Sequence, residues 1–135
     1  MPLTHKPSAQ SGVVPLLYPG DASKANVFLG GKSNLSFSRP SESLTSPADL
    51  VATKDETAPI AAGLFRMEKG KPLVYNYTYD EAKIILEGEC SITDEEGTTV
   101  IAKPGDVFLF PKGTTITFES QDYLLAFYVG QRPQL

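Results

Sequence analysis

Residues 75–88 read YNYTYDEAKIILEG, and the pattern in this stretch decides how the rest of the chain is interpreted. Every second position carries a side chain that can ionise or form hydrogen bonds, at Tyr75, Tyr77, Tyr79, Glu81 and Lys83. Because residues two apart in a strand share a face, a continuous strand would place these five side chains and Ile85 together. That mixture is unusual for a core and suits the lining of a pocket. If Tyr79-Asp80 breaks the strand, the shared face holds only from Glu81 onward.

Short apolar and β-branched runs, separated by turn-forming residues, surround this stretch. The strands that the pattern predicts span residues 26–30, 60–68, 73–79, 82–86, 89–93, 98–102, 107–110, 114–119 and 123–129. Turn signals lie between them, such as Lys69-Gly70-Lys71-Pro72 and Asp94-Glu95-Glu96-Gly97. Short strands with turns about every 8–12 residues indicate an all-β sandwich or barrel. The chain has no long helical periodicity and no glycine-rich phosphate loop.

Length and composition indicate one domain. The chain has 135 residues, which we divide into a flexible arm at 1–12 and a single domain at 13–135. No stretch approaches the ~20 apolar residues that a membrane span needs, and the N-terminus lacks the apolar core of a signal peptide. We therefore expect a cytoplasmic protein without a membrane partner. The net charge of −4, with Lys and Arg scattered, argues against nucleic acid as a partner.

Residues 32–58 are rich in Ser, Thr and Pro and hold few candidates for a core. We expect this loop-rich N-terminal segment to be a long surface excursion, which in a compact domain is either functional or poorly ordered. Within it, Ser46-Pro47-Ala48-Asp49-Leu50-Val51 predicts one short helical turn, with Ser46 as its cap and Pro47 at its first position.

Two spacings identify a resemblance to a known family. Glu81-x6-Gly88, followed by Gly105-x5-Pro111-x-Gly113, resembles the two motifs of the cupin superfamily over about residues 60–130. Within it the chain is similar to the ethanolamine-utilisation (EutQ-like) cupins and their small stand-alone fungal relatives. The resemblance implies a double-stranded β-helix, or jelly-roll barrel, with a pocket in its mouth. It also implies a homodimer that pairs through N-terminal edge strands such as residues 26–30.

The sequence departs from the cupin motifs at the metal ligands. The motif's histidines fall on Tyr75, Tyr77 and Ile116, so that only Glu81 remains of the four ligands that the resemblance implies. The chain has one histidine, His5 in the N-terminal arm, and one cysteine, Cys90. One carboxylate with two phenols is a poor site for zinc, nickel or iron. We therefore expect no metal and no other cofactor.

Glu81 and Lys83 are the candidates that replace the metal. A lysine ammonium supplies positive charge where the metal would lie, and Glu81 then serves as general acid or base. Tyr75 and Tyr77 would donate hydrogen bonds to a substrate oxygen, as in an oxyanion hole. This set suits a lyase, isomerase or cyclase acting on a small oxygenated molecule. The alternative is structural: Glu81 and Lys83 as a solvated cross-strand pair, and tyrosines that merely pack.

Weaker candidates would bind the substrate rather than react with it. Arg66 could reach into the barrel to hold a carboxylate or phosphate, although an exposed arginine is the simpler reading. Tyr79, Ile116 and Phe118 would complete the pocket wall, while Cys90 is expected to be an inert buried thiol. Two other functions remain open: a non-catalytic small-molecule-binding or sensor cupin, and an ethanolamine-utilisation-type accessory protein that is either shell-associated or handles acyl phosphates.

Overall fold

The structure is a computed structural model that describes the backbone of residues 26–29 and the whole of residues 49–134. These parts of the chain form strands joined by turns, without a helix. The strands are β1 (Asn26–Leu29), β2 (Val51–Ala52), β3 (Ala61–Glu68), β4 (Leu73–Asn76), β5 (Glu81–Gly88), β6 (Cys90–Thr93), β7 (Thr99–Ala102), β8 (Val107–Phe110), β9 (Thr115–Glu119) and β10 (Tyr123–Gly130). No helix long and apolar enough to cross a membrane was found among the described residues.

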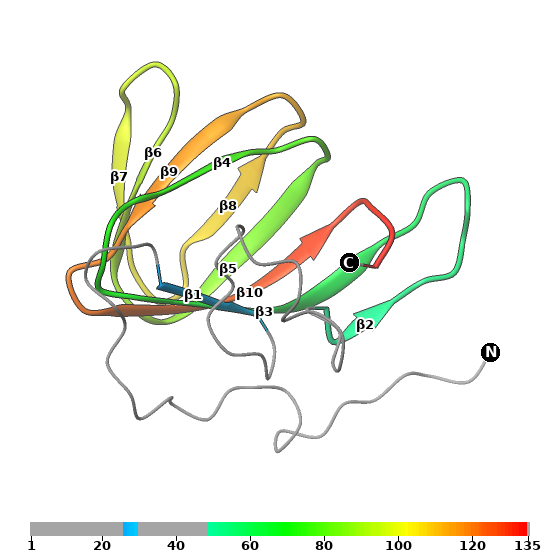
Figure 1. Cartoon of the computed structure of the whole chain (residues 1–135), viewed down its shortest axis with the longest axis horizontal. Coiled ribbons are helices and arrows are strands. Elements are labelled where there is room, and N and C mark those ends of the chain that lie inside the picture. Colours follow the sequence, from blue (N-terminus) through cyan, green and yellow to red (C-terminus); the bar gives the residue numbers. More distant parts are fainter. Residues whose placement is uncertain (1–25, 30–48, 135) are drawn as a thin grey trace.

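The strands make two antiparallel sheets that face each other (Figure 1). Sheet A has the order β1-β3-β10-β5-β8, with β2 also paired to β3. Sheet B has the order β4-β9-β6-β7. This arrangement confirms the all-β jelly-roll prediction. β1 lies at an edge of sheet A, the place where pairing between two copies was predicted, and that pairing stays a prediction.

The core lies between the two sheets and comes from alternate positions of their strands. In β10, Leu124, Ala126 and Tyr128 face the core, whereas Phe127 between them is 38% exposed. In β6, Cys90 and Ile92 are buried with Ser91 facing outward. Aromatic rings fill the centre of the core, with the buried members Phe65, Tyr77, Phe110, Phe118 and Tyr128. The period of two in the sequence therefore decides which side chains meet inside the barrel.

One glycine marks the point where the chain passes from one sheet to the other. β5 of sheet A runs through Gly88 and Glu89 into β6 of sheet B. Gly88 has a φ of 80°, which a residue with a Cβ rarely adopts. The Glu89 amide donates to the Tyr123 carbonyl at 3.0 Å, and the register of β10 against β5 shifts between Leu125 and Ala126. Such a shift bends a strand and so closes the barrel here.

The predicted strands are all present, and two local expectations change. β4 ends at Asn76 rather than residue 79, because the chain turns at Thr78-Tyr79 before β5 begins at Glu81. The helical turn predicted over Ser46–Val51 lies partly outside the described residues. In the described part Val51 begins β2, whose partners are Ala61 and Ala62. The arm predicted at 1–12 also lies outside the described residues.

Candidate functional site

Three of the predicted residues form one buried hydrogen-bonded cluster inside the barrel, the Tyr77–Glu81–Lys83 cluster. The Tyr77 hydroxyl donates to Glu81 Oε2 at 2.8 Å. Lys83 Nζ lies 3.3 Å from the same oxygen. The three residues are between 2% and 5% exposed. The phenol of Tyr77 and the ammonium of Lys83 therefore both contact the same oxygen of the Glu81 carboxylate, in a position shielded from water.

Backbone hydrogen bonds fix the segment that carries Tyr77 and leads into Glu81. The Tyr77 amide donates to the Thr114 carbonyl at 2.8 Å, and the Gly113 amide donates to the Tyr77 carbonyl at 2.7 Å. The Asp80 carboxylate accepts from the Lys112 amide at 2.8 Å. Although β4 has ended, this segment stays attached to the loop before β9. The alternation of side chains therefore continues across the break, and Tyr77 and Glu81 point into the barrel together.

Aromatic rings surround the Lys83 ammonium. Its Nζ lies 3.9 Å from the centroid of the Phe65 ring and 5.0 Å from that of Phe118. The rings of Phe110 and Tyr128 follow at 5.8 and 5.9 Å. Ring faces attract a cation electrostatically, and so they partly replace the water that burial removes from Lys83.

Burial and the neighbouring charges set the protonation of the cluster. Burial lowers the pKa of Lys83, and the Glu81 carboxylate only partly offsets that effect. Burial also raises the pKa of Tyr77, and the nearby Glu81 raises it further. Tyr77 therefore stays protonated and serves as a hydrogen-bond donor. Lys83 releases its proton more easily than an exposed lysine, which suits a group that transfers protons.

Tyr75 and Tyr79 lie beside the cluster and connect it to the surface. Their hydroxyl groups hydrogen-bond to each other at 2.8 Å. Both are partly buried, and both rings make edge contacts with Tyr77, at centroid distances of 4.7 and 5.7 Å. Tyr77 in turn stacks on Phe110 at 5.0 Å. The tyrosines that alternate in the sequence thus form a continuous aromatic wall from the surface to Glu81.

The remaining predicted residues divide between the core, where β9 of sheet B places Ile116 and Phe118, and the outer face of sheet A, where β3 places Arg66. Ile116 and Phe118 are 4% and 1% exposed and pack in the core, Ile116 opposite Tyr75 on the neighbouring strand. Arg66 does not join them, because Phe65 and Met67 point into the core and Arg66 between them faces the other way. There it pairs with Glu68 at 3.1 Å and lies over the Tyr123 ring.

The residues at the metal position of a cupin do not fit a metal. The Glu81 oxygen there already meets the Tyr77 hydroxyl and the Lys83 ammonium. The described residues hold no group of three His, Cys, Asp or Glu side chains placed to ligate an ion. A cation fixed 3.3 Å from the one motif carboxylate repels a second cation at the same place.

A second buried ion pair was not found from the sequence. Asp49 is fully buried and accepts two hydrogen bonds from Arg132, at 2.8 and 2.9 Å. The Tyr128 hydroxyl donates to the same carboxylate at 2.7 Å. Asp49 lies in a segment read as a surface excursion, and Arg132 is the last charged residue of the chain. No local spacing links two residues so far apart, so the sequence offered no signal for this pair.

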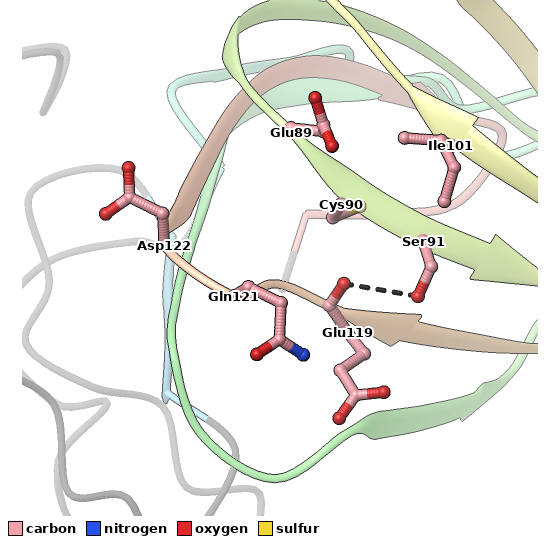
Figure 2. A pocket seen from close by; sticks show the side chains of 7 residues that line it. All are labelled: Glu89, Cys90, Ser91, Ile101, Glu119, Gln121 and Asp122. Atoms are coloured by element: carbon pink, nitrogen blue, oxygen red, sulfur yellow. Dashed lines mark hydrogen bonds between the residues drawn. The ribbon is translucent and has the colours of Figure 1, made fainter.

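A cavity of about 490 Å³ lies at the other end of the barrel (Figure 2). Its lining consists of Glu89, Cys90, Ser91, Ile101, Glu119, Gln121 and Asp122, so that none of the predicted site residues lines it. The Ser91 hydroxyl donates to the Glu119 carbonyl oxygen at 3.3 Å there. Cys90 is buried, and burial raises the pKa of its thiol to about 11. A thiol with so high a pKa is a weak nucleophile at neutral pH.

Comparison with known proteins places the chain in a family. The model of the family "Ethanolamine utilisation protein EutQ" matches residues 25–133. This chain belongs to the EutQ family. The "Acetate kinase EutQ" of Escherichia coli (strain K12) is 39% identical over 82 residues, which are 61% of this chain and 34% of that protein. The protein of the same name from Clostridioides difficile (strain 630) is 32% identical over 90 residues, 62% of this chain and 55% of its own.

The solved structures agree with a EutQ cupin. The Clostridium difficile EutQ protein superimposes with a TM-score of 0.54 at 27% identity, covering 63% of this chain and 64% of that one. A cupin-2 domain protein from Shewanella frigidimarina shares the fold, with a TM-score of 0.52 at 18% identity over 65% of this chain and 81% of its own. The chain thus spans about a third to a little over half of the curated EutQ proteins that it matches.

Proposed function

We propose that this EutQ-family cupin acts on a small oxygenated organic molecule at the Tyr77–Glu81–Lys83 cluster, as a metal-independent lyase, isomerase or cyclase. The observation that supports it is the shared Glu81 oxygen, with the Tyr77 hydroxyl at 2.8 Å and the Lys83 ammonium at 3.3 Å. Ionisable groups that are buried together and shifted in pKa mark functional sites more often than chance. The fold alone carries no activity.

The proposed chemistry is proton transfer next to a carbonyl or hydroxyl group. Glu81 takes the proton from the substrate carbon as general base. The ammonium of Lys83 and the hydroxyl of Tyr77 then stabilise the negative charge that develops on the substrate oxygen. Because burial lowers the pKa of Lys83, Lys83 can also return a proton to that oxygen. No metal ion is needed for these steps.

Proton exchange into deuterated water tests this proposal, because lyases and isomerases of this type share the removal of a carbon-bound proton. Acetone, pyruvate and dihydroxyacetone serve as enolisable probes, followed by NMR. We expect the protein to accelerate exchange of at least one probe. Glu81→Gln and Lys83→Met should each lower that rate at least tenfold, or ~1.4 kcal/mol in the barrier. The double variant should be little worse than either single variant, since the pair works as a unit.

Lys71→Met is the matched control, because Lys71 is exposed and lies in the turn before β4. It should exchange the probes at the wild-type rate. If the wild type exchanges no probe faster than buffer does, the catalytic proposal is refuted. Saturable binding of a probe without exchange would instead support the non-catalytic, ligand-binding alternative.

A second candidate function is an accessory role in acyl-phosphate handling, which the names of the E. coli and C. difficile relatives favour. Three arginine and lysine side chains of the described barrel are engaged with carboxylates: Arg66 with Glu68, Lys83 with Glu81 and Arg132 with Asp49. A phosphoryl group would have to compete with these partners.

Supplying the chain with ADP, magnesium and acetyl phosphate separates the two candidates. If proton transfer is the function, we expect no ATP above the buffer level in a luciferase assay. ATP formation that is lost in Lys83→Met but kept in Lys71→Met would favour the acyl-phosphate role and count against the first proposal.

A further inference from the structure

The buried Asp49 carboxylate is held in the way a protein holds a carboxylate ligand. Arg132 Nη1 donates to Oδ2 at 2.8 Å and Arg132 Nη2 donates to Oδ1 at 2.9 Å. The Tyr128 hydroxyl adds a third bond to Oδ1 at 2.7 Å. A planar guanidinium that engages both oxygens recognises a carboxylate by shape as well as by charge. The three donors converge on one carboxylate in a buried position.

The donors and the acceptor belong to different parts of the fold. Tyr128 lies in β10, a central strand of sheet A, and Arg132 follows the end of that strand. Asp49 lies two residues before β2, which consists of only Val51 and Ala52. Beside that strand, Leu50 donates to the Ala62 carbonyl at 2.8 Å. The donors therefore lie on and just after a central strand of sheet A, whereas Asp49 lies on the segment that leads into the two-residue strand paired to β3.

Two glycines leave the space that these side chains occupy. A Cβ on Gly63 would lie 2.7 Å from the Tyr128 hydroxyl and 3.3 Å from the Leu50 amide nitrogen. A Cβ on Gly130 would lie 3.1 Å from the Tyr79 ring and 3.5 Å from Arg132 Nε. A side chain at position 63 would press against the Tyr128 hydroxyl, and one at position 130 would press against the Tyr79 ring. Glycine at these two positions of β3 and β10 therefore leaves room for Tyr128 and Tyr79 beside the Asp49 site.

This site adjoins the Tyr77–Glu81–Lys83 cluster through one aromatic ring. The Tyr128 ring centroid lies 5.9 Å from Lys83 Nζ and 5.9 Å from the central carbon of Arg132. Arg132 also lies over the ring of Tyr79, at 5.1 Å. A molecule of a few carbon atoms that entered along the partly buried Tyr75 and Tyr79 would therefore meet Arg132 and Lys83 in close succession.

We propose that Arg132 and Tyr128 form a carboxylate-binding subsite, and that Asp49 occupies it as an internal carboxylate until the carboxylate of a ligand takes its place. The ligand is then a short organic acid with a hydroxyl or carbonyl group near its carboxylate. Its oxygenated carbon reaches the Tyr77–Glu81–Lys83 cluster, a part of the proposal that rests on the function proposed above. Exchange of one carboxylate for another keeps Arg132 paired, whereas a neutral ligand would leave a buried guanidinium without its partner.

Arg132 has capacity for a ligand that Asp49 does not use. Within the described part of the chain, its buried Nε has no hydrogen-bond partner. Burial acts to lower the pKa of Arg132, but Asp49 and the Tyr79 hydroxyl together outweigh that effect and the pKa is raised. The guanidinium therefore stays charged, and a ligand with an additional oxygen gains a bond to Nε.

The first experiment empties the subsite. In Asp49→Ala, the melting temperature should rise with acetate concentration and saturate, because acetate restores the missing partner of Arg132. Acetamide and matched sodium chloride should have no such effect. Adding Arg132→Met should abolish the acetate effect. Asp55→Ala, which removes an exposed carboxylate that accepts from the Thr57 and Ala58 amides, is the matched control and should not respond to acetate.

The second experiment asks whether a ligand displaces Asp49 from the wild-type protein. Lactate and pyruvate are the probes, and lactamide and pyruvamide are the neutral controls. Hydrogen exchange at the amides of Leu50 and Thr53, which bond to Ala62 and Ile60, should become at least fivefold faster with a saturating acid and stay unchanged with the amides. If Asp49→Ala does not fold, Asp49→Asn replaces it and should bind the acids at least tenfold more tightly than the wild type.

Each outcome decides the proposal. The proposal is refuted if acetate does not raise the melting temperature of Asp49→Ala, or if no acid accelerates hydrogen exchange at Leu50 and Thr53. Either result would show that the Asp49–Arg132 pair is a structural ion pair that no ligand displaces. Because the readouts are binding and exchange, they do not require turnover. If an acid displaces Asp49 in an inactive Glu81→Gln protein, the subsite is supported even if the proton-transfer function fails. If no acid displaces Asp49 in a protein that exchanges substrate protons, the subsite is refuted and the proton-transfer function stands.

Discussion

Replacing Lys83 with methionine is expected to lower the free energy of unfolding by about 3–5 kcal/mol, because it leaves a buried carboxylate without its cation. Methionine has nearly the volume of the lysine stem, so the loss of packing is small. Glu81 would keep only the Tyr77 hydroxyl of the two contacts at its Oε2 atom. Chemical denaturation of the wild type and the variant measures the difference.

Removing both charges should restore much of that stability. Burial lowers the pKa of Lys83, which means that the charged amine is disfavoured in the fold relative to water. We therefore expect Glu81→Gln/Lys83→Met to unfold within about 2 kcal/mol of the wild type, since a buried pair replaced by neutral groups is often neutral or stabilising. Lys71→Met, at an exposed position, should change nothing. A double variant as unstable as the sum of the singles would contradict the pairing.

Replacing Gly88 with alanine is expected to destabilise the fold by roughly 2–6 kcal/mol, the sum of backbone strain and overpacking. Gly88 has a φ of 80°, and a Cβ there would lie 2.1 Å from the Tyr123 carbonyl oxygen. The atoms that it meets are the backbone of β10, which cannot rotate away as a side chain can. The junction between β5 and β6, which closes the barrel, would have to shift.

Gly105→Ala is the matched control for this prediction. Gly105 also has a left-handed φ, 93°, but a Cβ there would meet nothing within 4 Å. It should cost only the strain of the backbone, about 1–3 kcal/mol. Equal losses of stability in the two variants would show that strain alone, and not the close approach of β5 to β10, makes a glycine necessary at position 88.

The sequence was most informative where the physical constraint is local. Turn residues and the period of two located the strands, because a strand that buries one face needs alternating side chains and ends where the chain must reverse. Three of the motif glycines, Gly88, Gly105 and Gly113, have positive φ values. β4 is three residues shorter than the predicted strand, because the chain turns at Thr78-Tyr79, close to the break at Tyr79-Asp80 that the sequence left open.

Alternation also explains which part of the site could be anticipated. Tyr77, Glu81 and Lys83 are separated by an even number of residues, so they point the same way, and the sequence predicted that they could share a cavity. It did not predict that the Lys83 ammonium would lie over the aromatic rings of Phe65, Phe110 and Phe118. For Arg66 the sequence left an inward and an exposed position open, with the exposed one simpler; Arg66 lies on the face of β3 away from Phe65 and Met67 and is 8% exposed.

The sequence by itself determined the strands, their turns and the inward set from Tyr75 to Lys83, because each depends on residues a few positions apart. Only the tertiary structure decided that Asp49 pairs with Arg132, whereas Glu81 and Lys83 lie two residues apart and could be considered together from the sequence. Asp49 and Arg132 are 83 residues apart, and they meet with Tyr128 because β2 pairs with β3 and β3 pairs with β10 in sheet A. Contacts between residues so far apart in the sequence are set by strand order and register. No local sequence pattern therefore shows that Asp49 pairs with Arg132.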